Sequence, residues 1–483
     1  MICSTRLGQC VPCYTCFALS ALTWFATPCV RADIGESRVA TWYQDAAAAY
    51  TLTADDCRAS QVLDLEPAWS QRGLKGTFFV NAHESLWCWQ TYGDAYATFP
   101  QRGHEIGSHT RKHYSVIVND PQHPTHCMSS LDELDQDCRE FNALLKEMTG
   151  LDTVTFAYPW GRDDADSRAV IADHYLSARD VANYREVNGV FVPNPPTPPD
   201  MHKLNCFICA GTNPWWPGHD FSVYETATAI YAQYITDTIA AGGWAIEFLH
   251  GLDPVDAVNK DAYFEHLDAL SALAAEGTIW NATQGDVSRY IYSRDAAVIE
   301  LLRADELGIE LVLDDGLDDT VFNVPLTVTT RIPEVWLERD TVLVLQGGTS
   351  KAARLFSDEE IAFASFEVLA DGVPALLFAG AGPDSLLGDV DGDGFVGSGD
   401  LDTVRFFWGE EVTPGDYSRG DLSGDGRVGS ADLDIVRACW GNRSHSATVP
   451  EPSTWMLLLV AAGLWFACRR AHPSMNRQGI RNP

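Results

Sequence analysis

Basic side chains are scarce in this sequence of 483 residues, where 33 lysines and arginines stand against 67 aspartates and glutamates. The resulting formal charge of −34 argues against nucleic-acid binding, which needs a cationic surface to contact phosphates. It also argues against a polybasic membrane-binding patch. An excess of carboxylates instead suits solubility or the binding of hard cations such as calcium.

Two common hydrolase signatures are missing as well. The sequence contains no GxSxG motif, and His104-Glu105 is not followed by the second histidine of an HExxH motif, so serine esterases and zincins lose their usual markers. Residues 392–397 read formally as GxGxxG, but their aspartates would repel a pyrophosphate and no βαβ unit opens there. With 46% hydrophobic residues over this length, we expect a globular protein of about two to four domains.

A hydrophobic run at about residues 10–30 follows Arg6 and ends at Val30-Arg31-Ala32, which places small residues at the −3 and −1 positions of a cleavage site. We therefore predict a secretory signal peptide over residues 1–32, and an N-terminal membrane anchor is the alternative. Export in turn affects how the 13 cysteines are interpreted.

Six cysteines lie between residues 57 and 209, namely Cys57, Cys88, Cys127, Cys138, Cys206 and Cys209. An even number in an exported chain favours structural disulfides, whose connectivity stays open among 15 pairings. The pair Cys206 and Cys209 could also be half of a zinc site or a redox motif, but no second CxxC follows it.

Near the C-terminus, the hydrophobic run 455–468 lies between Val449-Pro-Glu-Pro-Ser453 and Arg469-Arg470. Its 14 residues span about 21 Å as a helix, less than a bilayer core of roughly 30 Å, so length alone fits a buried helix equally well. The order of the three features resembles the PEP-CTERM sorting signal, here residues 446–472. That resemblance implies export, a C-terminal transmembrane helix as anchor, processing by an exosortase and a location at a bacterial cell surface.

Residues 388–401 recur as residues 420–433 with the spacing of a calcium loop, in which alternate side chains direct oxygens at one centre and position 7 offers its backbone carbonyl. The predicted calcium ligands are Asp389, Asp391, Asp393, Phe395 and Asp400 in the first copy, and Asp421, Ser423, Asp425, Arg427 and Asp432 in the second. Helical spacing after each loop predicts a small core from Leu401, Val404, Trp408, Leu433, Val436 and Trp440. Residues 386–445 resemble a type I dockerin, which implies bound Ca²⁺ and a cohesin-like partner.

Between residues 40 and 300, short β-like runs alternate with helical patterns, as in an α/β barrel or a layered sheet. A strand over 50–56 ends in the carboxylates Asp55 and Asp56, and a strand over 243–250 ends in His250. His109 and His113 are four residues apart, so we expect both rings on one face of a helical turn, where they suit one metal ion.

This series of motifs resembles the polysaccharide deacetylases of carbohydrate esterase family 4, the NodB-homology domain, which we assign to residues 33–300. The matching segments are Thr53-Ala-Asp-Asp-Cys57, the pair His109 and His113, Tyr158-Pro-Trp-Gly161 and Leu249-His250. The resemblance implies a distorted (β/α) barrel that hydrolyses N-acetyl groups on sugars.

The resemblance also implies roles for individual residues. Asp56, His109 and His113 would bind Zn²⁺ or another divalent transition metal, which acidifies water and polarises the acetamide carbonyl. Asp55 would be the general base and His250 the general acid. Tyr158 and Trp160 would lie at the oxyanion and the substrate, with a backbone N–H near Trp160 as oxyanion donor.

The chain departs from the family at three places. Phe156-Ala157 precede Tyr158 where the family has an arginine that tethers the base, so we name Arg179 as the replacement and Arg162 as the second candidate. The fourth motif is not recognisable, and Cys57 replaces a glycine. These departures concern substrate choice and rate more than metal binding.

Residues 301–385 change character, with short strands expected at 309–313, 324–329 and 341–345, and we predict a small β-sandwich there. The whole chain then reads as a secreted, metal-dependent polysaccharide deacetylase acting on N-acetylated amino-sugar polymers. The alternative is a catalytically inactive glycan-binding or scaffold protein of the cell surface, organised by its dockerin-like module. A third reading is hydrolysis of a non-sugar amide.

Overall fold

The computed structural model describes residues 33–443 apart from 83–86, 182–185, 188–189, 212–219, 255, 307, 339–341, 348, 359–360, 380–386, 392–393 and 414. The predicted signal peptide and sorting signal lie outside the described residues. Among the helices of the described part, none combines the length and the apolar character that a membrane span requires.

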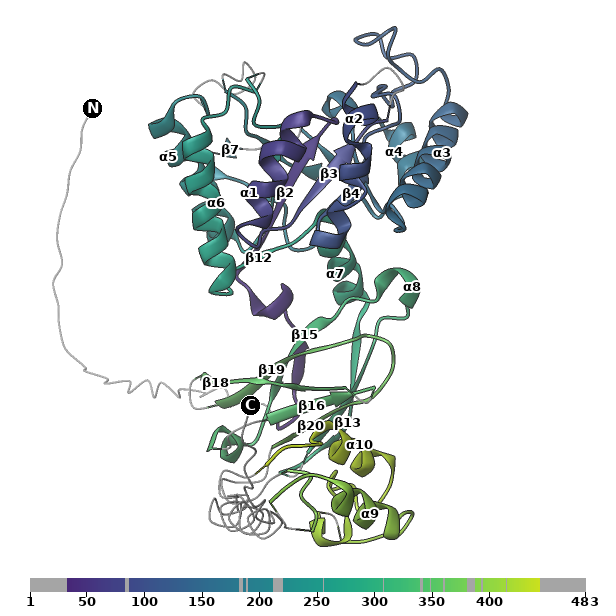
Figure 1. The fold of residues 1–483 in the computed structure, drawn as a ribbon, viewed down its shortest axis with the longest axis vertical. Helices are drawn as coiled ribbons and strands as arrows, with labels where there is room; N and C mark the ends of the chain where they lie inside the picture. The colour runs from purple at the N-terminus through teal and green to yellow at the C-terminus, as the bar shows by residue number, and fades with distance from the viewer. Residues whose placement is uncertain are drawn as a thin grey trace, which may run out of the picture. The chain divides into compact units, whose positions relative to one another are not determined.

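In the part of the chain that the structure describes, the first domain is built on a sheet of nine parallel strands. They are β2 (Ala48–Asp55), β3 (Gly76–Val80), β4 (Glu105–Ser108), β5 (Thr155–Ala157), β6 (Ser177–Asp180), β9 (Leu204–Asn205), β10 (Phe207–Ile208), β11 (Trp244–Leu249) and β12 (Ile279–Asn281). Their order is β10-β11-β2-β3-β4-β5-β6-β9, and β12 pairs with β2. Figure 1 labels β2, β3, β4 and β12 among them. Since β9 and β10 are separated only by Cys206, the segment 204–208 joins the two ends of the sheet and closes the barrel. The predicted α/β barrel is confirmed.

Helices follow the strands and cover the barrel, and Figure 1 shows α5 and α6 side by side along it. The helices of this domain are α1 (Glu66–Ser70), α2 (Trp87–Tyr96), α3 (Leu131–Thr149), α4 (Ala165–Ala172), α5 (Tyr224–Ala241), α6 (Lys260–Ala275) and α7 (Gln284–Ala296). Helix α3 shows why such segments are helical. Ser130 caps its N-terminus by accepting from the backbone N–H of Glu133, Gly150 ends it at φ 77°, and one apolar face is buried.

Two antiparallel sheets form the predicted β-sandwich. One has the order β1-β15-β19-β18 and the other β13-β14-β20-β16-β17, and a shared cluster of buried residues lies between them. The strands are β1 (Ser37–Val39), β13 (Val298–Ala304), β14 (Ile309–Asp314), β15 (Leu326–Arg331), β16 (Val342–Gln346), β17 (Thr349–Ala352), β18 (Arg354–Asp358), β19 (Ile361–Val368) and β20 (Ala375–Ala379), with the short helix α8 (Asp319–Phe322). Strand β1 precedes the barrel in sequence, yet it pairs with β15 of the sandwich.

A helix follows each predicted calcium loop, α9 (Ser398–Phe406) after the first and α10 (Ser430–Ala438) after the second. Val404 and Val436 are fully buried in a common cluster, as predicted. The prediction is wrong for Trp408 and Trp440, which are 50% and 51% exposed. Both tryptophans lie two residues beyond the end of their helix, so helical spacing no longer directs their side chains at the core.

The predicted disulfides are wrong for four cysteines of the first domain, because Cys127, Cys138, Cys206 and Cys209 have free thiols. Cys206 and Cys209 lie on the segment that closes the barrel, and both are fully buried. Neither belongs to a metal-binding group among the described residues. They act as small buried side chains here, and burial raises the pKa of the Cys206 thiol to about 12.

Candidate active site

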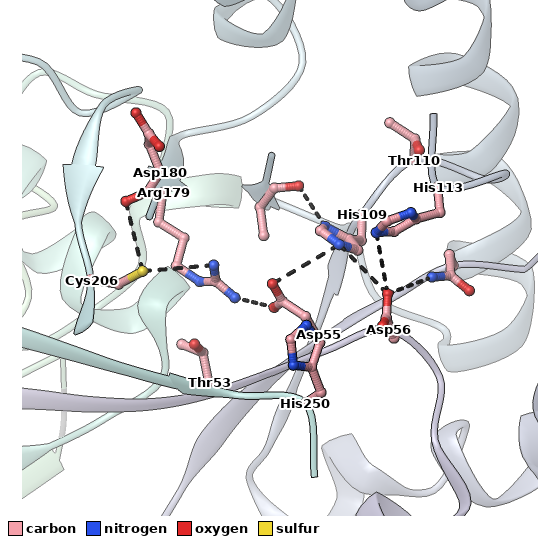
Figure 2. Close-up of polar contacts among 12 residues, drawn as sticks. Thr53, Asp55, Asp56, His109, Thr110, His113, Arg179, Asp180, Cys206 and His250 are labelled. Carbon is pink, nitrogen blue, oxygen red and sulfur yellow. Dashed lines mark hydrogen bonds and ion pairs between the residues drawn. The ribbon is translucent and has the colours of Figure 1, made fainter. Parts of the chain in front are cut away.

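The predicted catalytic residues lie where barrel strands end. Asp55 is the last residue of β2, Asp56 follows it at φ 66°, His109 follows β4, and His250 follows β11. Because these strands are parallel, their carboxyl ends meet at one mouth of the barrel. Figure 2 shows the four side chains gathered there together with His113.

The two histidines are not on a helical turn, so that prediction is wrong. They lie in an irregular turn after β4, in which Thr110 and His113 have φ values of 53° and 56°. The Thr110 hydroxyl oxygen accepts a hydrogen bond from the backbone N–H of Tyr114, which closes the turn. This closure brings His113 back beside His109, with ring centroids 4.8 Å apart.

Asp56, His109 and His113 form a group whose ligand atoms all lie within 4.8 Å of one another. The Nε2 atoms of His113 and His109 are 3.4 and 3.8 Å from Asp56 Oδ1. His109 Nδ1 lies 2.8 Å from the carbonyl oxygen of Ala157, which fixes that nitrogen as the donor and leaves Nε2 to bind an ion. Two imidazoles and one carboxylate fit a divalent transition metal.

The protonation states of this group also fit a cation. Burial lowers the pKa of both His109 and His113 to about 4, so the rings are neutral and can act as ligands near pH 7. Burial alone would raise the pKa of Asp56, but the neighbouring His109 and His113 outweigh it and the pKa is lowered. Two further residues orient the carboxylate, since Asn81 donates to Oδ1 at 3.2 Å and Arg58 to Oδ2 at 3.4 Å.

The side chain of Asp55 contacts Arg179 (Figure 2). Arg179 is the first candidate from the sequence for the arginine that holds this carboxylate. Arg179 is 1% exposed, and its guanidinium lies between the rings of Phe79 and Phe248. Burial raises the pKa of Asp55 to about 6, and the charge of Arg179 opposes that rise. Asp55 is therefore a buried carboxylate whose proton affinity suits a general base near neutral pH.

His250 is oriented by Asp256, a residue that the sequence prediction missed. Its Nδ1 lies 3.0 Å from Asp256 Oδ1, and Asp256 Oδ2 accepts from the backbone N–H groups of His250 and Gly251. Burial alone would lower the pKa of His250, but the hydrogen bond and the charge of Asp256 outweigh it and raise the pKa. The only sequence signal was an acidic residue six positions after the strand-end histidine.

Two predicted site residues have other contacts. Tyr158 is 1% exposed, packs with Phe156 and donates its hydroxyl to the carbonyl of His202, so its side chain is buried and does not face a substrate. Arg162 pairs with the buried Asp120 at 3.2 Å and not with Asp55, so it does not tether the base.

Trp160 lies at the rim of the mouth. It is 45% exposed, has φ 66°, and its ring contacts His113 edge-on at a centroid distance of 4.5 Å. On its other side it stacks on His123 at 4.2 Å, with 14° between the ring planes. His123 belongs to the loop that Arg162 holds through Asp120, and sequence reasoning did not single it out.

The first predicted calcium loop contains a second candidate metal-binding group, formed by Asp389, Asp391 and Asp400. Asp400 accepts from the backbone N–H groups of Val390 and Gly397, whereas Asp389 Oδ1 is buried without a partner, as expected of an oxygen that faces a cation. Predicted ligand Asp393 lies outside the described residues, and Phe395 forms an isolated bridge with Arg443.

In the second loop, Asp421, Ser423 and Asp432 are buried, and Asp421 accepts from the N–H groups of Gly424 and Gly426. Asp425 accepts from the N–H of Arg427. The two loops therefore have the same arrangement, in which the first and last carboxylates accept hydrogen bonds from backbone N–H groups of the loop.

Fold and site together define a (β/α) barrel protein with a candidate hydrolytic and metal-binding centre at its strand ends. Comparison with known families agrees: residues 44–178 match polysaccharide deacetylase, residues 387–438 match the dockerin type I domain, and residues 448–471 match the PEP-CTERM protein-sorting motif. All three resemblances expected from the sequence are confirmed.

Individual relatives are more distant. A gellan lyase of Bacillus sp is 27% identical over 314 residues, which is 62% of this chain but 12% of that protein. Among solved structures, a protein from Mycobacterium smegmatis described as a polysaccharide deacetylase is 14% identical, with a TM-score of 0.39 over 56% of this chain and 100% of its own. A family 4 acetyl xylan esterase from Clostridium thermocellum is 17% identical, with a TM-score of 0.30 over 49% of this chain and 89% of its own.

Proposed function

We propose that this protein is an exported, metal-dependent deacetylase that hydrolyses N-acetyl groups on an amino-sugar polymer. The observation that supports this most is the group of Asp56, His109 and His113, flanked by the Asp55–Arg179 pair and the His250–Asp256 pair. A metal site with a buried base on one side and an imidazole acid on the other has the parts that amide hydrolysis requires.

The residues divide the reaction as follows. Asp56, His109 and His113 would hold a divalent ion, which would supply Lewis acidity for polarising the acetyl carbonyl and for acidifying a water molecule. Asp55 accepts a proton from the attacking water while the oxygen of that water bonds to the acetyl carbon. Arg179 keeps the Asp55 carboxylate in place. His250 then donates a proton to the departing nitrogen as the C–N bond breaks, which releases acetate and the free amine.

Trp160 and Asp256 complete the proposal. Asp256 keeps the His250 ring oriented by accepting from Nδ1, so that Nε2 is the nitrogen that transfers the proton. The exposed Trp160 ring offers an apolar face beside His113 for a sugar ring of the polymer.

Acetate release from N-acetylglucosamine oligomers tests the proposal, with acetylated xylan as the ester control and with a chelator in parallel. We expect chelator-sensitive release from the amide substrate. Asp55→Asn should bind Zn²⁺ like the wild type but lose about 10²–10⁴-fold in kcat, whereas His109→Ala should lose both. His126→Ala, an exposed histidine outside the metal group, is the control. A wild type that binds glycans but hydrolyses none of them would favour the scaffold alternative.

The same proposal extends to the terminal parts. The dockerin-like loops would bind Ca²⁺ and present their helices to a cohesin-like partner, and the sorting motif would direct exosortase processing after export. These roles predict that the mature protein is found at the cell surface.

A further inference from the structure

Gln61 lies next to the candidate active site, and its side-chain amide contacts the backbone of both residues proposed to transfer protons. Its Nε2 donates to the carbonyl oxygen of Asp55 at 2.6 Å and to that of His250 at 2.6 Å. Gln61 is fully buried, so water does not compete for these bonds. Asp55 and His250 are far apart in sequence but adjacent through this one amide.

The orientation of the amide follows from its surroundings. Carbonyl oxygens only accept hydrogen bonds, so two of them at 2.6 Å require the NH₂ end of Gln61. The other end, Oε1, accepts from the hydroxyl of Tyr96 at 2.6 Å, and Tyr96 is itself fully buried on α2. All three contacts therefore agree on one amide orientation, and reversing it would face oxygen against oxygen.

This amide bridges β2 and β11 where their own pairing ends, although Asp55 still pairs with Phe79 of β3. The pairing of β11 with β2 ends at Leu249 and Ala54, one residue before His250 and Asp55. Beyond that pair the two strands no longer bond each other directly, and a donor to a buried carbonyl stabilises it. Gln61 supplies both bonds from the start of a π-helical turn (Gln61–Leu65), an irregular geometry often found at functional sites.

We propose that Gln61 is a positioning residue for the deacetylase reaction, which fixes the spacing between the base Asp55 and the acid His250 by holding their two strand ends together. This inference rests on the proposed function. It assigns Gln61 no contact with substrate or metal, so its loss should slow the chemical step while leaving metal and substrate binding in place. Misplacement of reacting groups by about 1 Å can cost roughly 10²-fold in rate.

The test replaces Gln61 with methionine, which has a similar length but no hydrogen-bonding amide. We expect Q61M to lower kcat by about 10- to 100-fold, with KM and the affinity of the apoprotein for Zn²⁺ alone within about threefold of wild type. The matched control is Q284M. Gln284 is also fully buried in the barrel, but it donates to Ser177 Oγ at the opposite end of the strands, so its loss should leave kcat within about twofold.

If Q61M does not give folded protein by circular dichroism, Q61E serves instead, since it keeps the shape but cannot donate to both carbonyls. A folded Gln61 variant with wild-type kcat would overturn the inference and leave the proposed function standing. A variant that loses Zn²⁺ affinity along with kcat would also overturn it, since Gln61 would then shape the metal site. A wild type that releases no acetate would reject the proposed function, and the inference with it.

Discussion

Asp55 and Asp56 are neighbours in sequence, yet their surroundings shift their pKa values in opposite directions. Burial raises the pKa of Asp55 to about 6, whereas the imidazoles beside Asp56 lower the pKa of that carboxyl. One carboxylate thus suits proton transfer and the other suits a cation. Burial raises both pKa values, but at Asp55 the charge of Arg179 does not outweigh it, whereas at Asp56 the neighbouring histidine pair does.

Arg179→Gln tests the first half of this division. The charge of Arg179 opposes the rise in the pKa of Asp55, so removing it should raise that pKa further. Because the proposed base Asp55 can accept a proton only when it is deprotonated, the acid limb of kcat/KM should move to higher pH. Arg162→Gln, which removes the partner of Asp120, is the control and should leave the limb in place. If the acid limb does not shift in Arg179→Gln, the group that titrates in this limb is not Asp55 paired with Arg179.

Asp256→Asn tests the acid. Asp256 raises the pKa of His250, so the variant should lower that pKa, and His250 should lose its proton at a lower pH. The basic limb of the kcat profile should therefore move to lower pH, as measured on N-acetylated oligomers. Asp253→Asn changes the same loop but pairs with Arg58, and it should keep the wild-type basic limb. A basic limb at the same pH in Asp256→Asn and Asp253→Asn would argue against His250 as the general acid.

At the scale of elements, the barrel and the dockerin-like module (residues 387–438) both use backbone geometry to gather side chains. Parallel strands bring their carboxyl ends to one mouth, and the turn after β4 returns His113 to His109 through the Thr110 bond. In the module, a carboxylate at the start of each helix holds the loop before it: Asp400 and Asp432 accept from backbone N–H groups of their loops.

Asp400→Asn tests the first loop. An asparagine has one oxygen in place of two and no charge, so it should lose bonds to Val390 or Gly397 and bind calcium poorly. Calcium titration of the full chain by calorimetry should then fall from two sites to one. Asp402→Asn, on the exposed side of α9, should retain both sites. Two unchanged sites in Asp400→Asn would exclude that residue as a ligand.

At the scale of the whole molecule, the β-sandwich takes its strand β1 from residues that precede the barrel in sequence. Strand β1 pairs with β15 nearly three hundred residues later, and the carbonyl of Ala40 accepts from the hydroxyl of Tyr290 on α7. The stability of the sandwich therefore depends on residues that precede the barrel in sequence.

Ala40→Pro tests this dependence. The backbone N–H of Ala40 donates to the carbonyl of Thr327 at 2.8 Å, and proline has no such donor. We expect a loss of about 1–3 kcal/mol in the free energy of unfolding, measured by chemical denaturation. Glu36→Ala keeps the backbone of the same segment and should change stability by less than about 0.5 kcal/mol. Equal stability of both variants would mean that β1 contributes little.

The sequence by itself determined which residues end the strands and the turn after β4, since motif order and hydrophobic runs are local properties. Asp55, Asp56, His109, His113 and His250 were all named from it, and so was the barrel. Local spacing failed where a segment left its regular element, as at Trp408 and at the turn that was expected to be helical.

Only the tertiary structure decided which partners stand behind those residues. Arg179 lies 124 positions from Asp55, and Gln61 lies 189 positions from His250. Sequence spacing gives no distance across a closed barrel, because contact depends on which strands are neighbours and on where the loops beyond their ends turn back. The same reason left two candidate arginines open until strand order brought Arg179, and not Arg162, to Asp55.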